Sequence, residues 1–182
     1  WRTGSPAKFK PFSEALAEQG VVGISAQYRL MAPNERLPHD AVRDARSALR
    51  YVRAHAESLG VDRERIGAGG ASWGGHLALM TALKTPYDDP SDDLTVSPKP
   101  ALLILMNPPL DMDDFPSPVP VAQRRDLSPI HLLEPGLPPT LIFQGTADKI
   151  VPASQAPVFR DRAAALGNKD VTVVMFEGRK HS

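Results

Sequence analysis

The stretch "IGAGGASWGGHLALM", residues 66–80, places five glycines around Ser72 and then continues as an apolar run. The small residues up to Gly70 suit a short strand, and the run from Gly74 onward suits a helix. Between them the chain reads G-x-S-x-G, which in a strand–turn–helix setting is typical of a nucleophile elbow. Close packing of a helix on a strand is the alternative explanation for so many small residues. We interpret the stretch as a turn that exposes the hydroxyl of Ser72.

Two glycines of this motif, Gly70 and Gly74, flank the serine at a distance of two residues on either side. We expect both to relieve crowding, because the central residue of such a turn adopts strained backbone angles. The start of the following helix also favours negative charge that develops beside the serine. The motif therefore predicts a catalytic turn.

Apolar runs alternate with amphipathic segments on both sides of this turn. We expect strands at residues 21–29, 65–70, 101–106, 140–145 and 171–176. We expect helices at residues 12–20, 37–60, 74–84 and 154–166. Two segments rich in proline, 85–100 and 107–139, are predicted to be irregular, the second of them near the active site. Apolar strands that alternate with helices indicate an α/β fold with a doubly wound, mostly parallel sheet covered on both faces.

The helix expected at 37–60 is the most strongly patterned segment. We expect its apolar face at Ala41, Ala45, Ala48, Leu49, Val52 and Ala56. Gly60 is expected to cap its C-terminal end, where Arg50, Arg53 and His55 suit the negative end of the helix dipole.

Composition narrows the classes of function. The 182 residues suit a single domain, 1–182, and the 21 basic residues equal the 21 acidic ones. This balance offers no basic surface for nucleic acid. There is no cysteine, hence no thiolate nucleophile, and no apolar run approaches the roughly 20 residues of a membrane span. Localisation, whether cytoplasmic or secreted, and oligomeric state are left open by the sequence.

A serine nucleophile needs a base, and the chain has five histidines to offer. Ligands bind beyond the carboxyl ends of parallel strands, so the loops after the strands should meet there. His181 follows the last strand and is our candidate base. His39 and His55 are expected at the surface or in a cap, His76 packed beneath the elbow, and His131 in a structural role.

The acid that orients the base is expected on a loop between Ser72 and His181. Asp148, in "QGTADKIVP", directly follows the strand expected at 140–145, in a turn shaped by Gly145. The alternative is the loop "NPPLDMDD", which offers Asp111, Asp113 and Asp114. Acidic runs beside prolines are more often solvated, so Asp148 is preferred and the other loop is the alternative.

Four quoted segments together resemble the α/β-hydrolase superfamily, in particular bacterial esterases and lipases of the acetyl xylan esterase-like and feruloyl esterase-like group. They are "YRLMAPNERLPHDAVRDARSALRYVR", "RIGAGGASWGGHLAL", "SPIHLLEPGLPPTLIFQGTADKIVP" and "FEGRKHS". The resemblance implies a serine esterase with Ser72 as nucleophile, Asp148 as acid, His181 as base and the Trp73 N–H as an oxyanion donor. It implies a small-molecule or carbohydrate ester as substrate, and neither a metal nor an organic cofactor. A serine peptidase of the same fold and a non-catalytic binding protein are the alternatives.

The sequence departs from this group at two places. A segment rich in histidine and glycine usually supplies further oxyanion donors, and we expect that segment and the first strands of the fold to precede Trp1. We likewise expect the usual last helix to follow Ser182, so that residues 1–182 alone hydrolyse esters poorly. The second departure is at Arg179 and Lys180, where the group more often has small residues beside the histidine.

Overall fold

Parallel strands and the helices between them build the core of the molecule. The computed structural model describes residues 4–32, 38–114 and 119–181. Its strands are β1 (Gly67–Ala71), β2 (Leu102–Met106), β3 (Thr140–Gly145) and β4 (Val171–Phe176). Its helices are η1 (Pro6–Phe9), α1 (Lys10–Ala17), α2 (His39–Ala54), α3 (Trp73–Ala82), α4 (Val121–Leu127), η2 (Pro129–His131) and α5 (Gln155–Ala165).

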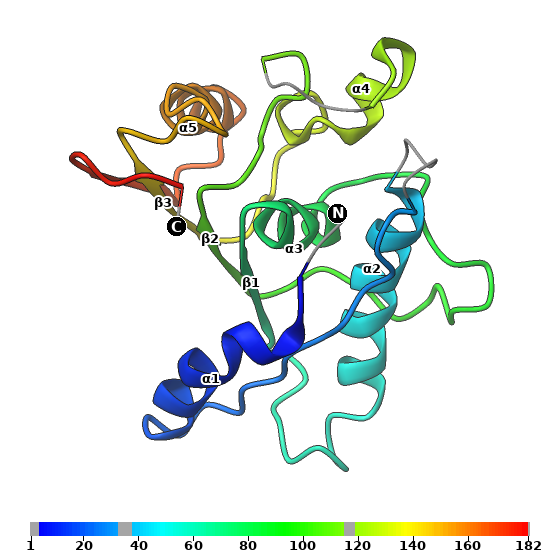
Figure 1. The fold of residues 1–182 in the computed structure, drawn as a ribbon. Helices are drawn as coiled ribbons and strands as arrows, with labels where there is room; N and C mark the ends of the chain where they lie inside the picture. Colours follow the sequence, from blue (N-terminus) through cyan, green and yellow to red (C-terminus); the bar gives the residue numbers. More distant parts are fainter. Residues whose placement is uncertain (1–3, 33–37, 115–118, 182) are drawn as a thin grey trace.

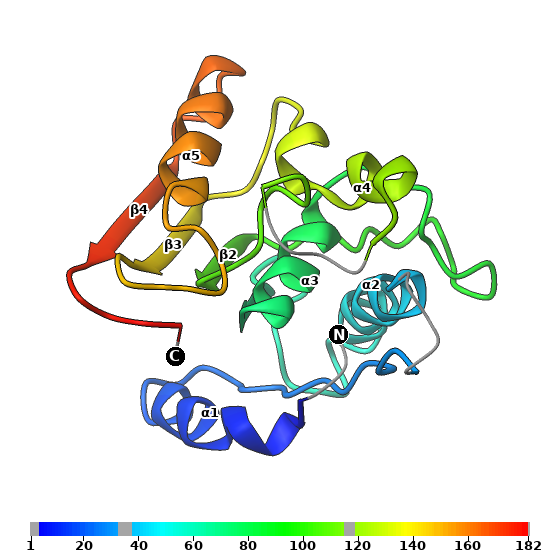
Figure 2. The same cartoon turned by 45° about the horizontal axis from the view of Figure 1, so that its top comes forward.

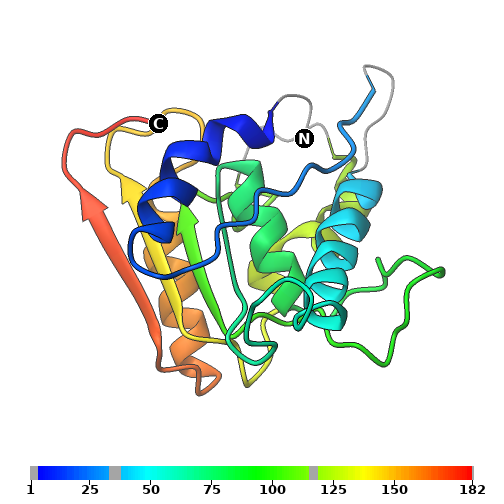
Figure 3. The ribbon, with the colours of Figure 1, turned by 90° about the horizontal axis from the view of Figure 1, so that it is seen from below.

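Each strand pairs with the next strand along the chain, so the described order is β1-β2-β3-β4, and every pairing is parallel. Parallel neighbours require a crossover connection, and α3 and α5 supply two of them. These helices lie on one side of the sheet and α1 lies on the opposite side (Figures 1 and 2). All strands therefore end at one edge, where Figure 3 shows the arrowheads of β2, β3 and β4 together.

The two faces of the sheet are buried to different degrees. On the helix-covered face, Leu103 and Leu105 belong to a core cluster with Leu77 of α3 and Phe159 of α5. On the other face Leu102 is 43% exposed, because α1 buries none of its own residues and provides little cover. The expected cover on both faces is thus incomplete within the described ranges.

Residues 21–29 do not form the expected strand. They lie exposed beside α1, and Val22 and Ile24 are about half exposed. Their β-branched side chains suit a strand, but a strand also needs a neighbour whose N–H and C=O groups complete the ladder. No strand of the described residues pairs with this segment.

The helix expected at 37–60 is shorter than its pattern suggested. Leu37 lies outside the described residues, and α2 ends at Ala54. Its last turn is closed by His55, whose Nδ1 lies 2.8 Å from the carbonyl oxygen of Tyr51, in agreement with the capping role expected for this histidine. Gly60, with a φ of +66°, ends a separate turn that follows the helix.

Two arginines lie on the buried face of α2. The sequence pattern predicts only apolar residues on this face, and it predicts that Arg50 lies near the negative end of the helix dipole. Arg46 and Arg50 are each 6% exposed. Arg46 donates to the carbonyl oxygens of Met80 and Leu83, both at 3.0 Å, and so caps the last turn of α3. Only the tertiary structure brings the last carbonyls of α3 against this face of α2.

The segment 85–100 is irregular, as expected, and its acidic residues neutralise these arginines. Asp88 lies 2.7 Å from Arg46 and 2.6 Å from Arg50, and Asp92 lies 3.1 Å from Arg50. Burial raises the pKa of the Asp88 carboxyl, but hydrogen bonds and charges from the two arginines outweigh that effect and hold the pKa below its ordinary value of 3.8. The loop is therefore fixed to α2 by partly buried ion pairs.

The segment 107–139 is not irregular throughout, because it contains α4 and η2. Pro120 stands at the N-cap of α4, where a proline does not interrupt the helix. The first part of the segment is held by Gln155 at the start of α5, which accepts the N–H groups of Leu110 and Asp111 and donates to the carbonyl oxygens of Asp111 and Asp114. Within the described ranges, no helix has the length and apolar character needed to cross a lipid bilayer.

Replacing Asp88 with Asn should lower the free energy of unfolding at about pH 7 by roughly 1–3 kcal/mol, because two buried guanidinium groups lose their shared carboxylate. The folded-state pKa is lowered, so this stabilisation is present above the ordinary pKa of 3.8 and disappears as the pH falls through the folded pKa. Urea unfolding at a series of pH values should show parent and variant converging in acid. The exposed Glu57→Gln is the matched control, and an equal loss in both variants would contradict the assignment.

Candidate active site

The loops that follow the strands are joined to one another at the carboxyl edge of the sheet. The N–H of Ser72 donates to the carbonyl oxygen of Met106 at 2.8 Å, and the N–H of Asn107 donates to that of Phe143 at 2.8 Å. Beyond β4, the N–H of Gly178 donates to the hydroxyl of Thr146 at 2.9 Å. The prediction that these loops meet is confirmed.

Ser72 sits on a sharp turn between β1 and α3. Its φ of +52° and ψ of −123° are rare for a residue with a side chain, and a residue in such a region is strained. It is the N-cap residue of α3, so its hydroxyl lies at the positive end of that helix. This backbone conformation is the one that the glycine-rich stretch predicts.

The glycines around Ser72 differ in their structural roles. A Cβ on Gly70 would lie 2.5 Å from the carbonyl carbon of Gly74, so this position must be glycine. A Cβ on Gly75 would lie 2.9 Å from the carbonyl oxygen of Gly70 and 3.2 Å from Pro108. A Cβ on Gly74, in contrast, would meet nothing within 4 Å. The expectation that Gly70 and Gly74 both relieve crowding is therefore right for Gly70 and wrong for Gly74, because Gly75 makes the second close approach.

Ser72, His181 and Asp148 form one chain of hydrogen bonds. The Nε2 atom of His181 lies 2.8 Å from the Oγ of Ser72, and its Nδ1 lies 2.6 Å from the Oδ2 of Asp148. With the ring proton on Nδ1, the imidazole donates to the carboxylate and accepts the serine hydroxyl proton at Nε2. The side chain of Asp148 is 0% exposed and that of His181 is 12% exposed. This arrangement can take a proton from Ser72 as its oxygen attacks an electrophile.

Several groups hold the carboxylate of Asp148 in place. Its Oδ1 accepts the N–H groups of Ile150 at 2.8 Å and Val151 at 3.0 Å, and Gln144 Nε2 lies 3.4 Å from Oδ2. Burial raises the pKa of Asp148, but the hydrogen bonds from His181 and from the two backbone N–H groups outweigh it and hold the pKa below its ordinary value. The carboxylate is therefore charged and fixed where it faces the imidazole.

Gly145 allows the loop that follows β4, residues 177–181, to cross the end of β3. We call this segment the histidine loop. A Cβ at this position would collide with the backbone carbonyl of Arg179. The carbonyl oxygen of Arg179 accepts the N–H of Ala147 at 2.9 Å, which joins the histidine loop to the turn that carries Asp148. The sequence suggested only that Gly145 shapes its own turn, whereas the structure shows that it permits contact with a second loop.

The remaining histidines do not reach the serine. His76 is fully buried, its Nε2 lies 2.9 Å from the carbonyl oxygen of Leu127, and burial lowers its pKa to about 4. Its ring meets that of Trp73 edge-on, which agrees with its expected place beneath the elbow. His39 stacks on Tyr87 at the start of α2, with ring centroids 4.2 Å apart. His131 lies in η2.

Asp111 and Asp113 of the alternative loop, residues 107–114, lie near residues other than His181. One carboxylate oxygen each of Asp111 and Asp113 and one ring nitrogen of His131 lie within 4.8 Å of one another. These aspartates therefore face His131 rather than His181. Arg124 lies 3.8 Å from Asp113 and brings a positive charge to that cluster, which does not favour a cation there. The geometry thus selects Asp148 as the partner of His181.

Sequence reasoning missed Asn107, which lies between the elbow and the turn of Asp148. Its φ is +46°, and its side-chain Oδ1 accepts the N–H of Gly145 at 2.9 Å. An Asn directly after a strand and before two prolines was the available signal, because Asn tolerates left-handed backbone better than most residues.

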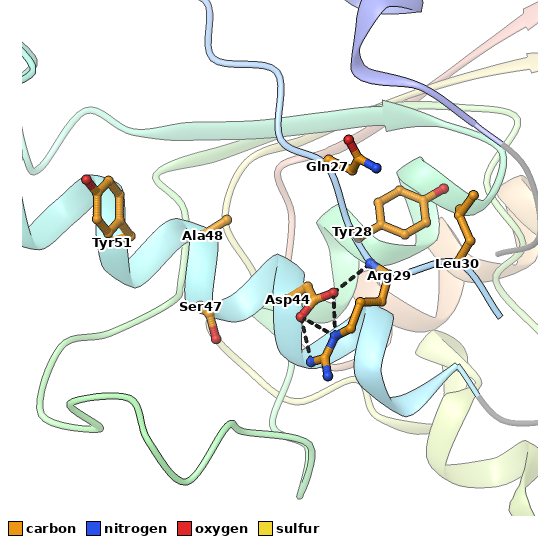
Figure 4. Close-up of a pocket in the computed structure, with 8 residues that line it drawn as sticks. All are labelled: Gln27, Tyr28, Arg29, Leu30, Asp44, Ser47, Ala48 and Tyr51. Atoms are coloured by element: carbon orange, nitrogen blue, oxygen red, sulfur yellow. Dashed lines mark hydrogen bonds and ion pairs between the residues drawn. The ribbon is translucent and has the colours of Figure 1, made fainter. Parts of the chain in front are cut away.

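An open surface pocket of about 600 Å³ lies apart from the residues of the triad and from Asn107, between the segment 27–30 and α2 (Figure 4).

Curated proteins and a family model match this chain. The BD-FAE family model matches residues 1–114. Esterase LipC of Mycobacterium tuberculosis is 28% identical over 187 residues, which cover 91% of this chain and 46% of that protein. The probable carboxylic ester hydrolase LipM of the same bacterium is 26% identical, over the whole chain and 47% of that protein. The chain therefore spans about half the length of the curated relatives it matches.

Solved structures match the chain over its whole length. Thermogutta terrifontis esterase 2 phosphorylated by paraoxon gives a TM-score of 0.92 at 38% identity, covering 100% of this chain and 68% of that one. The apo form of the same esterase gives a TM-score of 0.90 at 38% identity, covering 70% of its chain. At this identity the likeness concerns both fold and sequence.

The unequal glycines of the elbow allow a paired test. Gly70→Ala should destabilise the protein by roughly 1–3 kcal/mol, because the new Cβ is forced against the backbone of α3. Gly74→Ala should stabilise it by roughly 0.5–1 kcal/mol, because alanine replaces glycine in a helix where its Cβ has room. Urea unfolding of both variants is the measurement. If Gly74→Ala is as damaging as Gly70→Ala, the steric assignment is wrong.

Proposed function

The chain belongs to the BD-FAE family and has the α/β-hydrolase fold, and from this premise we propose that it is a serine esterase that hydrolyses carboxylic esters through an acyl-enzyme intermediate. The observation that carries the proposal is the pair of hydrogen bonds that join Ser72 to His181 and His181 to Asp148. The esterases among its relatives support the choice of reaction.

The first half of the reaction forms the acyl-enzyme. The Oγ of Ser72 attacks the ester carbonyl while the Nε2 of His181 accepts the hydroxyl proton. Asp148 stabilises the resulting imidazolium, which is why a buried and charged carboxylate is needed. When the tetrahedral intermediate collapses, the bond to the alcohol breaks and Nε2 returns the proton to the leaving oxygen. The acyl group then remains on Ser72.

The second half regenerates the serine. His181 takes a proton from water, and the water oxygen attacks the acyl carbonyl. Collapse releases the carboxylic acid and returns the proton to Ser72. In both halves the negative oxygen needs donors, and the backbone N–H of Trp73, the first residue of α3, is one of them in this proposal.

The relatives suggest the size of the acyl group. Structures of Thermogutta terrifontis esterase 2 include propionate-bound and butyrate-bound forms. We extend this to the present chain and propose that it accepts short acyl groups. Comparing p-nitrophenyl esters of increasing acyl length with peptide amides tests this choice and separates an esterase from a peptidase of the same fold.

In the full-length enzyme, Ser72→Ala should leave folding intact and remove nearly all ester hydrolysis, because losses within a serine triad cost on the order of 10⁴ to 10⁶ in turnover. The measurements are hydrolysis of p-nitrophenyl acetate, thermal unfolding and covalent labelling by a fluorophosphonate. The parent should be labelled and the variant should not. Activity within about tenfold of the parent would refute the nucleophile, and a parent that binds esters without turnover or labelling would indicate a non-catalytic binding protein.

Asp148→Asn should reduce turnover by roughly 10⁴, because the amide stabilises the wrong imidazole tautomer. Asp111→Asn is the matched control from the alternative acidic loop, and its turnover should stay within about twofold of the parent, since Asp111 lies beside His131. Steady-state kinetics of both variants decide between the loops. A large loss for Asp111→Asn with little loss for Asp148→Asn would move the acid to the loop after β2.

A further inference from the structure

The ladder between β2 and β3 continues past the end of β2 through a side chain. In a regular parallel pair, a residue donates its N–H to one carbonyl of the neighbour and accepts the N–H two residues further along. The N–H of Asn107 donates to the carbonyl oxygen of Phe143 at 2.8 Å, so the backbone carbonyl of Asn107 would next accept the N–H of Gly145. Instead, the Oδ1 of Asn107 accepts that N–H at 2.9 Å. The side chain takes the place of the backbone acceptor.

The left-handed backbone of Asn107 explains this replacement. With φ at +46°, the chain leaves the line of β2 and turns into Pro108. Pro108 then reaches the elbow, where a Cβ added to Gly75 would lie 3.2 Å from it. The turn thus allows one segment to contact the elbow and, through the Asn107 side chain, to hold the end of β3.

Asn107 stands at the junction of the loops that carry the triad. Its chain neighbour Met106 accepts the N–H of Ser72 at 2.8 Å. On the other side Gly145 contacts the backbone of Arg179, two residues before His181. Three residues beyond Gly145 is Asp148, whose turn is tied to the histidine loop by the N–H of Ala147. Both loops that present the base and the acid are therefore fixed to the residue that Asn107 holds.

We infer that Asn107 is a positioning residue that sets the distance between the Ser72 hydroxyl and the His181 imidazole, by holding the backbone of Gly145 against the end of β2. This inference rests on the proposed function. Asn107 itself touches neither the serine nor the histidine, and acts through Gly145. An error of about 1 Å in the placement of a catalytic group can cost on the order of 100-fold in rate, so one hydrogen bond at this junction is enough to control turnover.

The chemistry of this position restricts which residues can occupy it. Glycine would adopt the left-handed backbone without strain but has no acceptor for the N–H of Gly145. Alanine would lack the acceptor and keep the strain. Aspartate tolerates this backbone and retains an acceptor oxygen at the same place. Asn107→Gly, Asn107→Ala and Asn107→Asp therefore separate the effect of the hydrogen bond from that of backbone strain.

The test measures kcat and KM for p-nitrophenyl acetate in the full-length parent and in its three variants. Asn107→Ala and Asn107→Gly should lower kcat by roughly 10- to 100-fold with KM within about twofold of the parent, and Asn107→Asp should recover kcat to within about fivefold. The low-field proton NMR signal of the His181 imidazole N–H is a second readout, which should broaden or disappear in the first two variants and persist in the third. A glycine variant with the kcat and the NMR signal of the parent would overturn the inference.

The control is Asn168, a buried asparagine whose side chain, like that of Asn107, holds backbone groups by hydrogen bonds. It accepts the N–H groups of Gly136 and Leu137 and donates to the carbonyl oxygen of Glu134, but it precedes β4 at the opposite edge of the sheet. Asn168→Ala should lower the melting temperature and leave both kcat and the NMR signal unchanged. An equal loss of kcat in this variant would mean that Asn107 acts only through general stability. A parent without esterase activity would refute the proposed function, and the NMR signal would still test the positioning role.

Discussion

The triad must be assembled across the full width of the described sheet. Ser72 follows β1, Asp148 follows β3 and His181 follows β4, and neighbouring strands lie about 4.8 Å apart, so the first and last strands are separated by roughly 14 Å. The loop after β4 must therefore fold back over the end of β3 before the imidazole can reach the serine. The contact between Gly145 and the Arg179 backbone makes this return possible, because any side chain at Gly145 would occupy the path. The 2.8 Å contact between His181 and Ser72 depends on it.

Backbone strain is concentrated at the same edge. Among the described residues, Ser72 and Asn107 are the non-glycine residues with positive φ, and they end the adjacent strands β1 and β2. Strain of this kind persists only where the surroundings hold it, and here neighbouring loops do so through hydrogen bonds. The Ser72 N–H is held by the carbonyl of Met106, and the Asn107 side chain is held by the N–H of Gly145. The two strained residues therefore support the arrangement of the triad together.

The far end of α3 is held by charge. Arg46 caps the last carbonyls of α3, the helix that follows Ser72, while Asp88 and Asp92 neutralise Arg46 and Arg50. A buried guanidinium group requires such partners, because an unpaired charge in the core costs several kcal/mol. The irregular, acidic segment 85–100 thus has a structural role, since it completes the charge balance that lets α2 pack against α3.

Local sequence determined the elements that depend on neighbours in the chain. The glycines before Ser72, the apolar runs of β2, β3 and β4, and the order of Ser72, Asp148 and His181 predicted the sheet and the candidate site, because apolar runs, turns and chain order can be read from short segments. The sequence did not determine what depends on distant partners. The apolar residues 21–29 form no strand without a neighbour, α2 buries arginines because acids from 85–100 reach them, and Gly75 rather than Gly74 makes the second close contact of the elbow. Asn107 is a further example, because its side-chain oxygen can accept this hydrogen bond only where the fold brings it to the N–H of Gly145. The two residues are 38 positions apart in the chain, and the hydrogen bond between them is 2.9 Å long.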